Sequence, residues 1–99
     1  MAASKLVSLA DAEETGDGTE FYIRVPSGRE NIPVVISGIT TATVKVEGSF
    51  DGETWVELAS KTANFAGLVP AFPYMRGSVS AYTSGSIGVE FWADRSYGG

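Results

Sequence analysis

The alternation of apolar and polar residues constrains the fold of this chain more than any other feature of its sequence. Such alternation predicts β-strands with one buried face. No segment keeps an apolar period of 3.6 residues over three turns, so we expect helix at most as a short turn near residues 10–14. Seven segments have strand character: Lys5–Leu9, Glu20–Val25, Ile32–Ser37, Ala42–Phe50, Thr54–Ala59, Pro73–Tyr82 and Ser86–Ala93.

Turn signals rich in glycine separate these segments, for example Ser37-Gly38, Asp51-Gly52 and Ser84-Gly85. Short strands at this spacing predict an all-β fold, an antiparallel β-sandwich of jelly-roll or immunoglobulin-like type with about seven to eight short strands. A length of 99 residues fits one domain. We expect an N-terminal arm and acidic linker over residues 1–18 and a single sandwich domain over residues 19–99.

Residues that face each other across two antiparallel strands share a face of the sheet, and this fixes the register of two expected hairpins. In the last hairpin, a loop of Thr83-Ser84-Gly85 pairs Ala81 with Ile87, Val79 with Val89 and Gly77 with Phe91, and sets Arg76 beside Trp92. In the earlier hairpin, a loop of Asp51-Gly52-Glu53 pairs Gly48 with Val56, Val46 with Leu58 and Glu47 with Glu57. The expected core is Phe21, Ile23, Val25, Val34, Ile36, Val44, Val46, Val56, Leu58, Val79, Val89 and Phe91.

The chain contains no cysteine and no histidine. It therefore lacks disulfides, thiolate nucleophiles, imidazole bases and the usual zinc and haem ligands. The carboxylates of Glu47 and Glu57 are expected to lie near Lys45 in water, whereas a glycosidase needs one carboxylate in a desolvated cleft. The acidic residues Asp11 and Asp17 do not follow the EF-hand spacing, so a solvated loop is expected. We expect no enzymatic activity and no catalytic, cofactor-binding or metal-binding residues.

The net charge of −5 lies mainly in residues 1–20, which carry one lysine and five acidic residues. Nucleic acid is therefore not an expected partner, because phosphate binding needs clustered lysine and arginine. The N-terminus lacks the apolar core of a signal peptide, and the chain has no apolar run of 18 residues, so no membrane association is expected.

Ser49, Asp51, Gly52, Thr54 and Trp55 resemble the Asp-box, the pattern S-x-D-x-G-x-T-W on the blade hairpins of sialidases. Those enzymes carry several copies on a propeller, but this chain has one shortened copy and no internal repeat. We therefore predict a structural turn. Asp51 would accept hydrogen bonds from nearby backbone N–H groups, Thr54 would close the turn, and Trp55 would lie beneath the loop and shield those bonds.

Two features have the character of interaction surfaces. Asn64–Pro73 is apolar but contains two prolines and a glycine, so it cannot be a central strand. It is either a plug at one end of the sandwich or a docking loop. Aromatic residues on the faces opposite the core, namely Tyr22, Tyr74, Tyr82 and Trp92, are either partly exposed side chains or contacts for a protein or a sugar.

Three stretches, GTEFYIRVPSG, ATVKVEGSFDGETWVELAS and PYMRGSVSAYTSGSIGVEFWA, resemble small β-sandwich virion proteins of tailed bacteriophages. Those proteins share a V-x-V-x-G-S-x-D-G-x-T-W hairpin and a closing R-x-x-V-x-x-Y-T-S-G hairpin, and the likeness spans about residues 18–93. It implies a non-enzymatic virion component, assembled in the host cytoplasm. The expected role is a capsid cement or decoration protein that binds the major capsid protein; the alternative is a tail- or fibre-associated module that binds carbohydrate for host adsorption.

The partners implied by this resemblance are the major capsid protein or another virion protein, and further copies of the chain, with a trimer favoured. The N-terminal segment would add as a strand to a sheet edge of its own domain or of a neighbour. The apolar segment would supply buried area. The candidate interface residues are Leu6, Val7, Leu9, Phe65, Leu68, Phe72, Tyr22 and Trp92.

Overall fold

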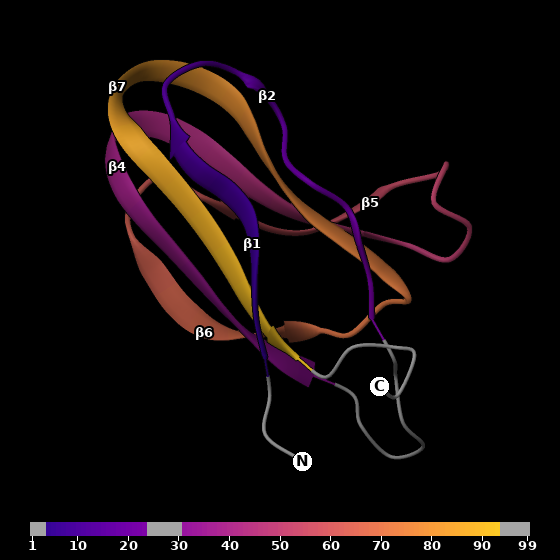
Figure 1. Ribbon diagram of the computed structural model, residues 1–99. Coiled ribbons are helices and arrows are strands. Elements are labelled where there is room, and N and C mark those ends of the chain that lie inside the picture. Colours follow the sequence, from indigo (N-terminus) through magenta and orange to yellow (C-terminus); the bar gives the residue numbers. More distant parts are fainter. Residues whose placement is uncertain (1–3, 24–30, 94–99) are drawn as a thin grey trace.

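The structure, a computed structural model, describes residues 4–23 and 31–93 (Figure 1). Its elements are β1 (Ser4–Ala12), β2 (Gly16–Asp17), β3 (Phe21–Tyr22), β4 (Asn31–Ser49), β5 (Val56–Lys61), β6 (Phe65–Pro70) and β7 (Tyr74–Ala93). Every strand pair in these ranges is antiparallel, and no residue in them is helical. The all-β antiparallel prediction is confirmed, whereas the short helical turn near residues 10–14 is not formed.

Two long strands, β4 and β7, form the centre of the sheet. They pair from Val34 and Phe91 at one end to Ser49 and Tyr74 at the other. Several register shifts interrupt this pairing near the middle, between residues 37 and 44 of β4. Such β-bulges bend a strand and increase its twist, and both ribbons curve strongly at this point (Figure 1).

Two glycines permit the sharp bend, which we call the crease. Gly38 in β4 and Gly85 in β7 have φ angles of 78° and 132°. A side chain on Gly38 would collide with the carbonyl oxygen of Ser86, and a side chain on Gly85 would collide with the carbonyl oxygen of Gly38. Both the backbone conformation and the close approach of the strands therefore require glycine at these two positions.

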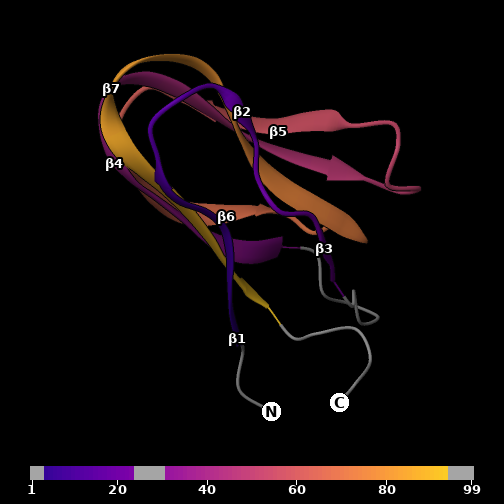
Figure 2. The ribbon, with the colours of Figure 1, turned by 45° about the horizontal axis from the view of Figure 1, so that its top comes forward.

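The crease divides the sheet into two halves that fold over each other (Figure 2). The first half contains, in spatial order, β6, residues 31–37 of β4, residues 86–93 of β7, and β1. The second half contains β5, residues 42–49 of β4, residues 74–81 of β7, and the short strands β2 and β3. The described strands thus form one folded sheet, and the expected β-sandwich of jelly-roll or immunoglobulin-like type is not confirmed.

The predicted hairpin at Thr83-Ser84-Gly85 is wrong. Val79 pairs with Val44, and Val89 pairs with Ile36, so both segments belong to one strand along β4. The chain bends at Gly85 but does not reverse, because β4 supplies hydrogen-bonding partners on both sides of the bend. For the same reason Ile32–Ser37 and Ala42–Phe50, predicted as separate strands, are both parts of β4.

The N-terminal segment adds to a sheet edge of its own domain, one of its two expected positions, whereas the apolar segment differs from both of its expected forms. The segment expected as an arm over residues 1–18 contains β1, which pairs with β7 of the same sheet, and β2. The stretch expected as a plug or docking loop contains β6, which pairs with β4 over six consecutive residues. Because β6 is an edge strand, Pro70 at its end is tolerated.

The core lies between the two halves, and most of the predicted core residues are in it. Val56 was predicted there but is 48% exposed, because it begins the edge strand β5. Phe21 and Leu58 are partly buried and pack against the core, and Val25 lies outside the described residues. The buried apolar side chains are Leu6, Ile23, Ile32, Val34, Ile36, Ala42, Val44, Val46, Val69, Met75, Val79, Ile87, Val89 and Phe91.

Candidate functional site

The loop between β4 and β5 is held by the side chains of Asp51 and Ser49. The Asp51 Oδ1 atom accepts hydrogen bonds from the backbone N–H groups of Glu53 (2.8 Å) and Thr54 (2.9 Å) and from the Ser49 hydroxyl (2.9 Å). The N–H groups of Thr54 and Glu53, followed by the Ser49 hydroxyl, lower the pKa of Asp51. The Asp-box-like motif therefore forms a structural turn, as the sequence predicts.

The register around this loop agrees with the prediction only in part. Gly48 pairs with Val56 and Glu47 pairs with Glu57, as expected. The expected pairing of Val46 with Leu58 is wrong, because a bulge inserts Leu58 and Val46 pairs with Ala59. The loop is also longer than three residues, since β4 ends at Ser49 and β5 begins at Val56.

Trp55, which was expected beneath the loop, packs on Arg76. The guanidinium carbon of Arg76 lies 4.0 Å from the centroid of the indole ring. The predicted contact of Arg76 with Trp92 is wrong, because these two residues lie in different halves of the sheet. Tyr74 occupies the space near the loop: a Cβ on Gly52 would lie 3.8 Å from its ring.

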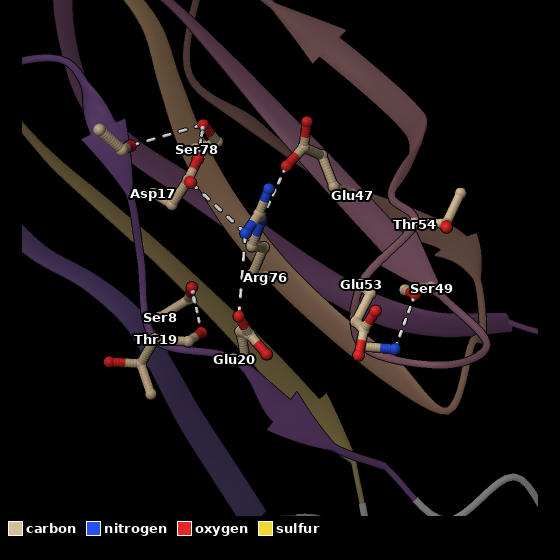
Figure 3. A network of polar contacts seen from close by, with 12 residues as sticks. Ser8, Asp17, Thr19, Glu20, Glu47, Ser49, Glu53, Thr54, Arg76 and Ser78 are labelled. Atoms are coloured by element: carbon tan, nitrogen blue, oxygen red, sulfur yellow. Dashed lines mark hydrogen bonds and ion pairs between the residues drawn. The ribbon is translucent and has the colours of Figure 1, made fainter.

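Arg76 is the centre of the polar network in Figure 3, which joins β7, β4 and the segment around β2. Its Nε donates to Glu47 Oε1 at 2.8 Å, and its Nη1 lies 3.4 Å from Asp17 Oδ2 and 3.8 Å from Glu20 Oε2. The Ser78 hydroxyl also donates to Asp17, at 2.8 Å. With its side chain only 15% exposed, Arg76 attaches the acidic segment to the sheet.

Each of the two paired glutamates has a cationic partner. Glu47 is engaged by Arg76, and Glu57 lies 3.2 Å from the Lys45 ammonium. The expectation that both carboxylates are solvated is wrong for Glu47, whose side chain is 19% exposed, while that of Glu57 is 50% exposed. Within residues 4–23 and 31–93, no three acidic side chains come together in an arrangement that could hold a metal ion.

The outer face of the first half is apolar. One row of paired residues crosses all four strands of this half: Ala66, Val35, Glu90 and Val7. The neighbouring row contains Leu68 beside Pro33 and Trp92 beside Lys5. Leu68, Val7 and Trp92 are 64%, 38% and 37% exposed. We call these eight residues the apolar outer face; its charged members Lys5 and Glu90 lie 3.9 Å apart and neutralise each other.

The structure distributes the predicted interface residues over several environments. Leu68, Val7 and Trp92 belong to the apolar outer face. Leu6 is buried in the protein's own core, and Leu9, Phe65 and Phe72 pack against it. The expected exposure of Leu6 is therefore wrong, because β1 pairs within its own sheet and turns this side chain into the core, whereas Leu9, Phe65 and Phe72 are only partly buried.

The remaining predicted aromatic residues lie apart from that face. Tyr22 is 56% exposed in the second half, with its ring centroid 5.1 Å from that of Tyr74. Tyr82 packs against the core near the crease, where its hydroxyl donates to the carbonyl oxygen of Gly85 at 2.7 Å. Phe50, which was not among the predicted interface residues, is 76% exposed and packs on Phe72 with 4.8 Å between the ring centroids.

Five members of the apolar outer face were not among the predicted interface residues, namely Lys5, Pro33, Val35, Ala66 and Glu90. The sequence feature that indicates this face is the continuous apolar run Ile32–Ile36, because a strand covered on both faces has no polar alternation.

Comparisons with protein-family models, with curated proteins and with solved structures give no match. In the described ranges, no helix is long and apolar enough to span a membrane.

Proposed function

We propose that this protein is a non-enzymatic structural component of a bacteriophage virion: a capsid cement or decoration protein that binds the major capsid protein and stabilises the head. The proposal combines the resemblance of its motifs to small virion proteins with the chemistry of its surface. In this role it needs no cofactor, because binding depends on the shape and polarity of one face.

The observation that carries the proposal is a change of pattern within a single strand. In the second half, β4 alternates strictly, with buried Val44 and Val46 between the more exposed Thr43, Lys45 and Glu47. In the first half the same strand is apolar on both faces, from Ile32 to Ile36. A strand with one face in water keeps the alternation, whereas a strand covered on both faces loses it. We infer that a partner covers the outer face of the first half.

The two outer faces support a definite orientation on the capsid. The outer face of the second half carries Lys45, Glu47, Glu57 and Arg76 and suits contact with water. The apolar outer face would lie against the capsid protein, where burial of Leu68, Val7 and Trp92 releases water and stabilises the complex. The Lys5–Glu90 pair leaves this face without net charge, so docking does not bury an unpaired charge.

A sedimentation experiment with heads purified from the phage that encodes the chain tests this orientation. The double variant Val7→Ser/Trp92→Ser should raise the dissociation constant for heads by about tenfold or more, since about 1.4 kcal/mol corresponds to tenfold in affinity. It should therefore bind fewer copies per head at the lowest concentration at which the parent fills its sites. The matched control is Tyr22→Ser, which removes an exposed aromatic side chain from the second half and should leave occupancy unchanged. Full occupancy by the folded double variant would refute the proposed interface.

The alternative role in carbohydrate binding finds less support. Trp92 lies in the first half, whereas Tyr22 and Tyr74 lie in the second half, so these aromatic residues do not form one platform. The rings of Tyr22 and Tyr74 are inclined at 59° to each other and do not present one flat stacking surface. Binding to a glycan array that is lost in Trp92→Ser would nevertheless favour this role over capsid binding.

A further inference from the structure

The edges of the sheet differ in how well they are protected against pairing with another chain. An exposed edge strand presents unpaired N–H and C=O groups, and bulges, charges or short length normally block its pairing. β1 has two register shifts and carries Lys5 and Asp11. β5 has a bulge and carries Glu57 and Lys61. β2 and β3 have two residues each.

Among the described edge strands, β6 has none of these protections over most of its length. Its six residues pair with β4 without any register shift. The sequence has no charged residue between Lys61 and Arg76, and Pro70 restricts only the last position of the strand. Ala66 and Leu68 are exposed, so the outer face of β6 is also uncharged and accessible. The edge of β6 is therefore a regular, neutral template for strand addition.

We propose that a second copy of this chain occupies this edge, by antiparallel pairing of its own β6 around a twofold axis. Opposite residues must share a face, so either two core-facing or two outward-facing residues meet on the axis. A register with Gly67 opposite Gly67 of the second copy places Leu68 opposite Ala66 and Val69 opposite Phe65. Leu68 then lies beside the smaller Ala66, and Phe65 and Val69 flank the space above Gly67. Pro70 stays near the end of the paired region.

A second copy suits this edge better than a charged strand, because β6 itself carries no charged side chain. The Lys61 ammonium approaches only its first residue, 4.1 Å from the centroid of the Phe65 ring. Pairing of two β6 strands joins the first halves of two molecules into one continuous sheet. It also joins their apolar outer faces across the axis, through Leu68 and Ala66. The twofold dimer is independent of the proposed capsid role and differs from the trimer that the resemblance favours, which would need another interface.

Two charge variants at the same positions test the pairing and its register together. In the proposed register, residue 66 of each copy lies opposite residue 68 of the other. Ala66→Lys/Leu68→Lys therefore places like charges directly opposite each other twice, and should raise the dimer dissociation constant by at least about tenfold. Ala66→Glu/Leu68→Lys places opposite charges at both contacts, and should keep the dissociation constant within about threefold of that of the parent protein.

Analytical ultracentrifugation over a concentration series measures these constants for the full-length chain. Both positions are exposed on the outer face, so both variants should keep the parent far-UV circular dichroism spectrum, which checks the fold. A dimer in the parent that is lost in the Lys/Lys variant and kept in the Glu/Lys variant supports the proposal. A parent that stays monomeric at millimolar concentration overturns it. The proposal is also overturned if the Lys/Lys variant dimerises as tightly as the parent, or if both folded variants lose the dimer to the same extent.

Discussion

Val89 packs directly against the bare backbone of Gly77 from the opposite side of the core. A Cβ placed on Gly77 would lie 2.8 Å from the Cβ of Val89. Gly77 pairs with Val46 in the second half, whereas Val89 pairs with Ile36 in the first half. The two residues are thus on one strand but in facing layers, and their contact shows how closely the folded sheet packs against itself.

This contact predicts that Gly77→Ala destabilises the protein by overpacking, by about 1–3 kcal/mol. The added methyl group and Val89 compete for the same space, so Gly77→Ala/Val89→Ala should be less destabilised than the sum of the two single variants. Urea denaturation of the four proteins measures the coupling. Additivity within about 0.5 kcal/mol would contradict the packing of Gly77 against Val89.

The core assignment predicts unequal effects of two truncations. Phe91→Ala should lower the free energy of unfolding by about 3–5 kcal/mol, because the ring is fully buried and its removal leaves a cavity. Val56→Ala serves as the control and should lower the free energy of unfolding by less than about 1 kcal/mol, because Val56 is 48% exposed. Thermal and urea melts compare the two variants, and equal losses of stability would show that the face assignment is wrong.

The strand content and most of the core follow from local pattern alone. Val44 and Val46 alternate with polar neighbours, and this alternation assigns a face to each residue whatever the strand pairs with. The turn at Asp51 was predictable for a similar reason, since its hydrogen bonds connect residues only two or three positions apart.

The path of the chain through the crease was not predictable in this way. Gly38 and Gly85 have the local sequence of hairpin turns, but each lies in a bend within one continuous strand. A glycine with positive φ permits either outcome, and the outcome depends on whether a partner strand continues beyond it. The Arg76 network depends on the same choice of partners, because Asp17, Glu47 and Arg76 meet only when β2 and β4 both pair with β7.

The hydrogen bonds to Asp51 predict a pH-dependent contribution to stability. They lower the pKa of Asp51 in the folded state, so its ionised form stabilises the fold above the ordinary pKa of about 4. This contribution is lost as the pH falls through the lowered folded-state pKa. Asp51→Asn should therefore melt at a lower temperature than the parent at pH 7, and the difference should shrink toward pH 2–3.

The control for this pH dependence is Glu53→Gln, a neighbouring exposed residue whose backbone N–H, rather than its carboxylate, contacts Asp51. It should change the melting temperature little at neutral pH. A difference between parent and Asp51→Asn that stays constant from pH 7 to pH 2 would show that ionisation of Asp51 does not stabilise the loop.

The Arg76 network predicts that loss of the arginine alone lowers the free energy of unfolding more than loss of Arg76 together with the Glu47 charge. Arg76→Met should destabilise the protein by about 2–4 kcal/mol, because it leaves the partly buried Glu47 carboxylate without its partner and Trp55 without the stacked guanidinium. Arg76→Met/Glu47→Gln should recover part of this loss, since no unpaired charge remains.

Arg76→Lys keeps the positive charge but loses the planar guanidinium group. Its free energy of unfolding should therefore lie between those of the parent and Arg76→Met. Urea denaturation at low and high salt ranks the four proteins. If the double variant is less stable than Arg76→Met, the Glu47 carboxylate does not depend on Arg76.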